Sequence, residues 1–128
     1  MTNPIVFISR NRIKPGMLDD FTNHYLKSIP RVEANKPGTL VQIAYLNADS
    51  TQVDIVRIFP GTEAMDQQLQ GADDRSKVTY QYIEPTGIEI YGAPSDGAMA
   101  KMKKVAGSRI EVSIIPHFMG GFIRLNGG

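Results

Sequence analysis

The sequence predicts an α+β protein built on a ferredoxin-like antiparallel sheet with helices on one face. Two observations support this prediction. A strand, a Pro-Gly corner and a helix occur twice, at residues 4–34 and 53–70, which is the pattern of a duplicated β-α-β unit. The length of 128 residues, with 41% of them apolar, fits a single domain over residues 1–128 with a sizeable core.

The composition argues against several classes of partner and site. The net charge is +1, with 14 basic and 13 acidic residues dispersed along the chain, so neither nucleic acid nor an anionic membrane is expected. The absence of cysteine excludes disulfides and thiolate metal sites. With only His24 and His117 and with scattered carboxylates, no metal site is expected. No secretory signal or bilayer-length apolar stretch is present, which favours a cytoplasmic protein.

The first strand is predicted from Pro4 to Ile13, and its apolar front half suits a strand covered on both faces. Alternation then places Asn11 on the same face as Phe7, toward an apolar space. An unpartnered amide there costs about 1–3 kcal/mol. Asn11 therefore either bonds to a nearby backbone turn or is kept in a cavity to bind something.

Lys14-Pro15-Gly16 ends this strand, and a helix is predicted from Met17 to about Ala34. Its predicted apolar stripe consists of Leu18, Phe21, Tyr25, Ile29 and Val32. Pro30 is expected to kink or end the regular helix near Ser28. His24 lies on the flank of the stripe, where a boundary histidine with one hydrogen bond is favoured over a ligand or a base.

Two further strands, Thr39–Leu46 and Val53–Phe59, are predicted to form a hairpin around residues 47–51. Pro60-Gly61 repeats the earlier corner and leads into a helix that turns Met65 and Leu69 inward. Another helix is expected from Gly71 to the Glu84-Pro85 pair. Within it Tyr80 and Tyr82 point in different directions, so one belongs to the core and the other is exposed or lines a cleft.

The remaining chain is predicted to hold a short strand, Gly87–Tyr91, and a helix capped at Ser95-Asp96. A last β region covers Arg109–Leu125, broken at Pro116 and bent at 117–121. A proline and two glycines there favour an edge strand or an arm that reaches a neighbour.

The segment Asn-Arg-Ile-Lys-Pro-Gly at 11–16, with the helix after it, resembles the antibiotic biosynthesis monooxygenase-like (ABM) domains. The strand Val53–Phe59, its Pro-Gly and the helix through Leu69 share the resemblance. It covers about residues 4–91, and residues 92–128 look like an extension. The resemblance implies a dimeric α/β barrel, in which the sheets of two subunits close on each other and a ligand pocket lies between helices and sheet.

That superfamily includes cofactor-independent oxygenases of aromatic polyketides or quinols, and haem-degrading enzymes. Asn11 matches the pocket asparagine of the haem-degrading branch, but the matching tryptophan position looks like Gln68. No histidine falls around Val78 to Tyr80, where the axial ligand belongs. Haem degradation is therefore not expected, and no cofactor is predicted.

A cofactor-free oxygenase needs a base and donors for a developing oxyanion. Asn11 is the candidate donor, and His24, Tyr80 or Tyr82 would orient or deprotonate a phenolic substrate. Arg57 would steady an anion if it faces the pocket, although an ion pair with an acidic neighbour is favoured. The candidate site residues are Asn11 and His24 for catalysis, and Arg57, Gln68, Tyr80 and Tyr82 for substrate binding.

Two other functions remain open: a protein that binds a small apolar or aromatic metabolite, and a domain that only dimerises. A pocket with Asn11 and two or more further polar groups favours the enzyme, and a purely apolar one favours binding. Val6 and Ile8 lie on the face opposite Phe7. Burying each of these side chains would contribute roughly 1.5–3 kcal/mol, so this face is expected to be covered. A homodimer through this sheet face is therefore expected.

Overall fold

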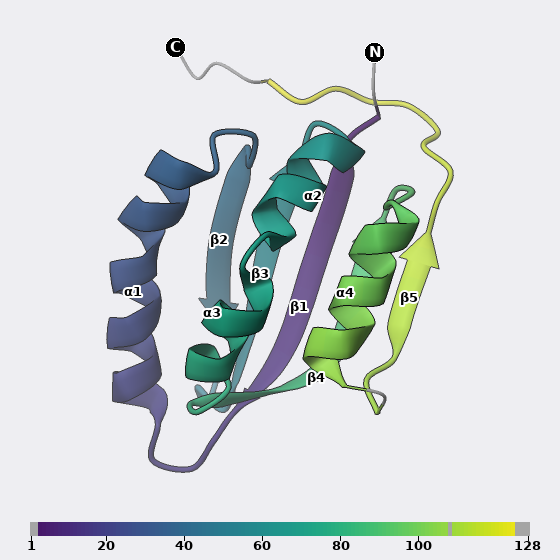
Figure 1. Ribbon diagram of the computed structural model, residues 1–128. Coiled ribbons are helices and arrows are strands. Elements are labelled where there is room, and N and C mark those ends of the chain that lie inside the picture. The colour runs from purple at the N-terminus through teal and green to yellow at the C-terminus, as the bar shows by residue number, and fades with distance from the viewer. Residues whose placement is uncertain (1–2, 108, 125–128) are drawn as a thin grey trace.

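The computed structural model describes residues 3–107 and 109–124, and it contains a five-stranded sheet with the strand order β2-β3-β1-β4-β5 (Figure 1). The strands are β1 Ile5–Ile13, β2 Val41–Leu46, β3 Gln52–Phe59, β4 Ile83–Tyr91 and β5 Val112–Ile115. The first four pair with antiparallel neighbours, and β5 joins the edge by parallel pairing with β4. This arrangement is the predicted ferredoxin-like sheet with one additional strand.

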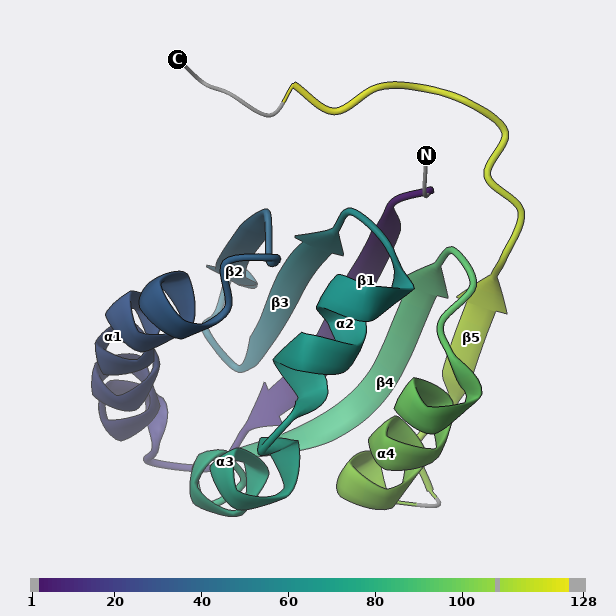
Figure 2. The ribbon, with the colours of Figure 1, turned by 45° about the horizontal axis from the view of Figure 1, so that its top comes forward.

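The helices all lie on one face of this sheet (Figure 2). They are α1 Leu18–Asn35, α2 Thr62–Leu69, α3 Ala72–Thr79 and α4 Asp96–Ala106. We call the covered side the inner face and the opposite side the outer face. The predicted fold class is confirmed, including the placement of the helices.

Strict alternation along β1 and β3 separates the two faces. Phe7 is paired with Arg57 and Asn11 with Val53 on the inner face, while Ile8 is paired with Val56 on the outer face. The inner face supplies much of the core, whose most buried large side chains are Phe59, Ile5, Met65, Ile83, Ile90 and Asn11. Asn11 is 1% exposed, which confirms the prediction that its amide lies on the same face as Phe7 and points into the interior.

Helix α1 continues through Pro30 to Asn35, so it does not end near Ser28, and its predicted extent to about Ala34 is confirmed. A proline removes one helical hydrogen bond, and the helix tolerates this loss because its apolar side packs on the inner face. Phe21 is 3% exposed and stacks on Tyr25 at 5.9 Å between ring centroids. The Ser28 hydroxyl also donates to the carbonyl of Tyr25 at 2.6 Å, one turn before the proline.

The boundary between α3 and β4 differs most from expectation. The helix ends at Thr79, and the strand begins at Ile83 instead of Gly87, so Pro85 lies inside a strand. Pro85 is paired with Asn11, next to the point between Arg10 and Asn11 where the register shifts. A bulge accommodates a residue that cannot donate to the ladder, which explains the proline.

The two Pro-Gly corners differ in geometry. Gly16 has φ +76°, a left-handed conformation that glycine adopts without strain. Gly61 is extended, with φ 178°, so the second corner does not repeat the first. The predicted hairpin is present, and the Asn47 carboxamide oxygen accepts from the backbone N–H groups of Thr51 and Gln52, at 2.9 Å each.

The chain after β4 forms α4, an edge strand and an extended segment. The Ser95 hydroxyl accepts from the N–H of Ala98 at 3.0 Å, as expected of an N-cap. The predicted edge strand is β5, and residues 116–124 follow it without strand structure, so the expected strand at 122–124 is absent. Leu125 lies outside the described residues. None of the helices in the described part of the chain is long and apolar enough to cross a membrane.

Candidate functional site

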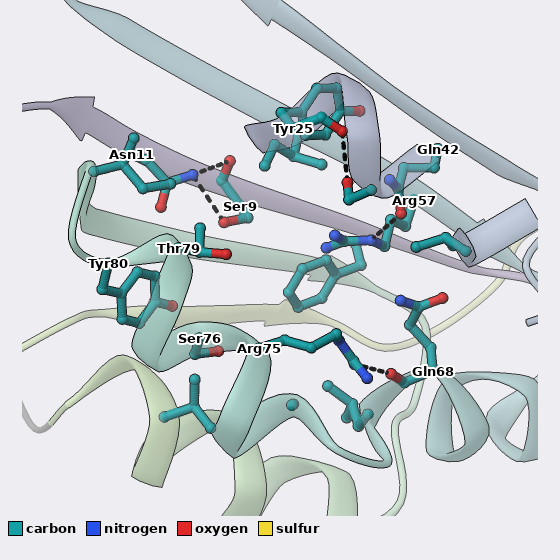
Figure 3. A pocket seen from close by; sticks show the side chains of 18 of the residues that line it. Ser9, Asn11, Tyr25, Gln42, Arg57, Gln68, Arg75, Ser76, Thr79 and Tyr80 are labelled. Atoms are coloured by element: carbon teal, nitrogen blue, oxygen red, sulfur yellow. Dashed lines mark hydrogen bonds between the residues drawn. The ribbon is translucent and has the colours of Figure 1, made fainter. Parts of the chain in front are cut away.

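A cavity of about 430 Å³ lies between the inner face and the four helices. Its floor comes from β1, β2, β3 and β4, and its cover comes from α1, the α2–α3 segment and α4. In the view of Figure 3, Asn11, Ser9 and Tyr80 lie on one side of the cavity, and Arg57, Gln42 and Gln68 lie on the other. The cavity stands where the ABM resemblance implies a ligand pocket.

Asn11 is buried in the cavity floor, and the Nδ2 and Oδ1 atoms of its amide differ in their hydrogen bonding. Its Nδ2 donates to Ser9 at 3.2 Å (carbonyl) and 3.0 Å (hydroxyl), and to the Val53 carbonyl at 3.4 Å. Its Oδ1 has no hydrogen-bond partner in the described part of the chain. The Asn11 donor is therefore engaged by Ser9 and Val53, as the first of the two alternatives expects, and is not free to act as the predicted donor for a substrate. A role in binding a ligand stays a prediction, and the group available for it is the acceptor Oδ1.

His24 projects from α1 into the cavity wall. Its Nε2 lies 3.0 Å from the Thr79 hydroxyl, and its ring lies 5.3 Å from that of Tyr82. Burial lowers the pKa of His24, and the nearby positive charge of Arg31 lowers it further. The imidazole is therefore neutral at neutral pH and can accept a proton.

The two tyrosines have different positions. Tyr80 lines the cavity, and burial raises the pKa of its hydroxyl, which stays protonated and can donate. Tyr82 does not line the cavity; it packs behind His24. The prediction that both residues lie on a helix is wrong, because they lie in the turn between α3 and β4. As expected, only one of the two, Tyr80, lines the cleft.

Arg57 points into the cavity from the middle of β3. Its Nε donates to the Oε1 of Gln42 at 2.8 Å across the β2–β3 pair. No carboxylate in the described ranges forms an ion pair with Arg57, so the expected acidic neighbour is wrong. Burial lowers the pKa of Arg57 to about 10, and the guanidinium still carries its charge at neutral pH.

The α2–α3 side of the cavity is held by hydrogen bonds to the backbone. Gln68 is 5% exposed, and its Oε1 accepts from the Thr39 hydroxyl at 2.6 Å. The guanidinium of Arg75 donates to the carbonyls of Gln68 and Gln70, at 2.5 Å and 2.6 Å. Arg75 thus links the backbone at the α2–α3 junction. The two Nη atoms of Arg57, by contrast, have no hydrogen-bond partners among the described residues.

Gln42, Tyr25 and Arg75 are among the polar residues of this cavity that sequence reasoning did not nominate. Gln42 follows from alternation, since it is the position opposite Arg57 in the predicted hairpin. Tyr25 was assigned to the apolar stripe, but its hydroxyl is buried without a hydrogen-bond partner in the described chain. Arg75 gave no signal, because its role depends on how α3 packs beneath α2.

The cavity and fold together define a ferredoxin-like α+β protein with a ligand-sized space beneath its helices. No protein-family model matches the chain, and no curated protein sequence matches it. Its solved structural neighbours include proteins described as antibiotic biosynthesis monooxygenases (ABM) and a cofactor-independent oxygenase. The chain therefore shares the fold of these ABM proteins, and the resemblance read from residues 11–16 is confirmed for the fold.

Three of these structures show the extent of the likeness. MupZ from Pseudomonas fluorescens is 13% identical with a TM-score of 0.69, and the match covers 96% of each chain. SnoaB, a cofactor-independent oxygenase from Streptomyces nogalater, is 11% identical with a TM-score of 0.60, covering 73% of this chain and 96% of SnoaB. An ABM-type protein from Chloroflexus aurantiacus is 15% identical with a TM-score of 0.57, covering 74% and 96%.

The described residues contain no group of three or more histidine, cysteine or acidic side chains that could hold a metal ion. The chemistry available in the cavity comes from neutral histidine, tyrosine hydroxyls, amides and arginine. These groups can move a proton, accept or donate hydrogen bonds and hold an anion.

Proposed function

We propose that this protein is a cofactor-independent oxygenase that acts on a small, largely apolar molecule with an acidic C–H or phenolic O–H group. The observation that carries the proposal is the set of polar groups converging on the cavity around Asn11. A polar site of this kind favours an enzyme over a carrier of apolar metabolites.

The proposed reaction assigns a role to each group. Neutral His24 takes the acidic proton of the substrate, the Oδ1 of Asn11 accepts from a substrate hydroxyl, and Tyr80 donates to the developing oxyanion. The resulting carbanion reduces O₂ and bonds to it as a peroxide. Loss of water then leaves a carbonyl, so that a CH₂ group and O₂ become C=O and H₂O without an external reductant.

A hydroxyanthrone tests this function, because its CH₂ group is acidic and its oxidation gives a coloured quinone. We expect the wild type to accelerate quinone formation and O₂ uptake above the spontaneous rate. Asn11→Ala should lower the enzymatic rate by at least about tenfold, since removing one polar group of a preorganised site costs this much or more. Asn23→Ala, on the exposed side of α1, is the matched control.

Equal rates with and without the wild-type protein would rule out this oxygenase. Binding of the anthrone without turnover would favour the second candidate, a non-catalytic binding protein. Circular dichroism of Asn11→Ala separates a lost function from a lost fold, because the substitution also removes the bonds to Ser9 and Val53.

We also propose that the protein forms a homodimer through the outer face of the sheet. Apolar side chains share this face on three adjacent strands: Val6, Ile8, Val41, Ile43, Val56 and Ile58. In the single chain Ile43 remains 45% exposed and Tyr45 69% exposed. A second copy with the same face would cover them by two-fold symmetry, and ABM-fold proteins commonly dimerise.

A further inference from the structure

Arg57 is a cation in the cavity without a carboxylate partner. The ion pairs of the described residues lie elsewhere, and the only hydrogen bond from the Arg57 guanidinium goes to the neutral Gln42. A charge removed from water without a counter-charge is costly, and proteins rarely keep one without a role. The two free Nη atoms form the fork that matches the two oxygens of a carboxylate.

The rest of the cavity wall has the same sign of charge. Its ionisable cations are Arg31, Arg57 and Arg75, and no aspartate or glutamate lines it. Arg75 already donates to two backbone carbonyls, and Arg31 is exposed on α1. Arg57 is therefore the arginine that can bind an anion inside the cavity.

Tyr25 supplies a second donor near Arg57. Its hydroxyl is buried without a hydrogen-bond partner in the described chain. Burial raises the pKa of Tyr25, against smaller opposing effects of Gln42 and the Arg57 charge, so the hydroxyl keeps its proton. A neutral O–H next to a guanidinium adds a donor to an anion site without adding charge.

The register of the sheet sets the distance between this site and Asn11. Asn11 is opposite Val53 and Phe7 is opposite Arg57, so four residues of β3 separate the two positions. At about 3.3 Å per residue this spacing is about 13 Å along the sheet. Ile55 and Ile88, on either side of Ser9 in the sheet, line the floor between them, and Phe7 lies beside Arg57. These apolar side chains suit an apolar ligand body.

We propose that the ligand of this cavity is an elongated apolar acid, whose carboxylate is bound by Arg57 and Tyr25 and whose opposite end meets Asn11. This inference rests on the proposed function, since it names the substrate class of the same site. A fused-ring aromatic acid with a hydroxyl at the far end fits the spacing and both groups.

The probe is 6-hydroxy-2-naphthoate, with 6-hydroxy-2-naphthamide as the neutral molecule of nearly the same shape. Titration followed by the fluorescence of the naphthol gives a dissociation constant for each at pH 7.5. We expect the wild type to bind the acid on the order of 10- to 100-fold more tightly than the amide, the range for hydrogen bonds to a charged group. Equal affinities, or no binding of the acid, would overturn the proposal.

Arg57→Met should abolish this preference for the acid while leaving the affinity for the amide within about twofold. Arg31→Met, which removes an exposed charge of the same wall, is the matched control and should retain the preference. A preference that survives in Arg57→Met would place the anion elsewhere and contradict the assignment. The wild-type comparison of acid and amide needs no variant, so it decides the question even if Arg57→Met does not fold.

The binding experiment tests the carboxylate site and the turnover experiment tests the oxygenase, so each hypothesis can be refuted without the other. Selective binding of the acid together with no oxidation of the anthrone would refute the oxygenase but retain the carboxylate site. Turnover of the anthrone by a protein that does not distinguish acid from amide would retain the oxygenase and refute the carboxylate site.

Discussion

Both faces of the sheet carry arginine, but the described structure pairs it with carboxylates only on the outer face. Arg10 lies 2.6 Å from Asp54 and 3.1 Å from Glu89, and Arg12 pairs with Glu84. On the inner face Arg57 meets only the amide of Gln42. Charges that are already neutralised in pairs suit the proposed dimer interface on the outer face, whereas the unpaired cation in the cavity suits the proposed carboxylate ligand.

The apolar residues of the two faces differ in a similar way. Neighbours on one strand have different surroundings: Phe59 is 1% exposed beneath α2, while Ile58 lies on the outer face without a helix over it. The inner face is thus covered by helices of its own chain, and the outer face is the one that the proposed dimer would cover. Substitutions at adjacent positions should therefore change different properties of the protein.

The largest expected effect is on assembly. Ile8→Asp places a charge in the middle of the outer face and, in a symmetric dimer, does so twice. Losing the burial of about 1.5–3 kcal/mol per side chain should raise the dimer dissociation constant by at least roughly 100-fold, giving monomer or insoluble protein. Size-exclusion chromatography with light scattering measures this, and a well-folded dimeric variant would contradict the outer-face interface.

A pair of neighbouring substitutions sharpens the comparison. Phe59→Ala should lower the free energy of unfolding by about 3–5 kcal/mol, because it empties a core position beneath α2. Ile58→Ala should cost less in a dilute monomer and should make the unfolding midpoint depend on protein concentration. Urea unfolding at two protein concentrations separates them, and equal, concentration-independent losses would show that both residues belong to one core.

The smallest effect is expected from pH at His24. Its pKa is lowered on folding, so the unfolded chain takes up the proton at higher pH than the folded protein does. The free energy of unfolding should therefore fall as pH drops below about 6.5, and level off below the folded pKa.

His24→Gln removes this contribution, so the variant should lose less stability than the wild type between pH 7.5 and 5. Urea unfolding at the two pH values measures the difference. His117→Gln alters the other histidine of the chain, which is exposed after β5, and should behave as the wild type. Identical pH dependence in all three proteins would show that His24 titrates normally and is not held neutral.

Much of this molecule was predictable because its signals are local. The alternation of β1 placed Asn11 on the same face as Phe7, and Ser95 marked the start of α4. The errors lie where tertiary packing overrides local preference. Helix α1 continues through Pro30 because its apolar side packs on the sheet. Pro85 lies in β4 because the neighbouring bulge leaves a position that needs no backbone N–H donor.

The sequence by itself determined the duplicated β-α units, the sheet and the polar residues that its strands turn inward, because strand and helix periodicity depend on residues close in the chain. Only the tertiary structure decided which partners those residues meet. The Asn11 amide donates to Ser9 and Val53 and leaves an acceptor free, and Arg57 finds Gln42 instead of a carboxylate. Hydrogen bonds and charge pairing join atoms from distant segments, and their geometry exists only after the elements have packed.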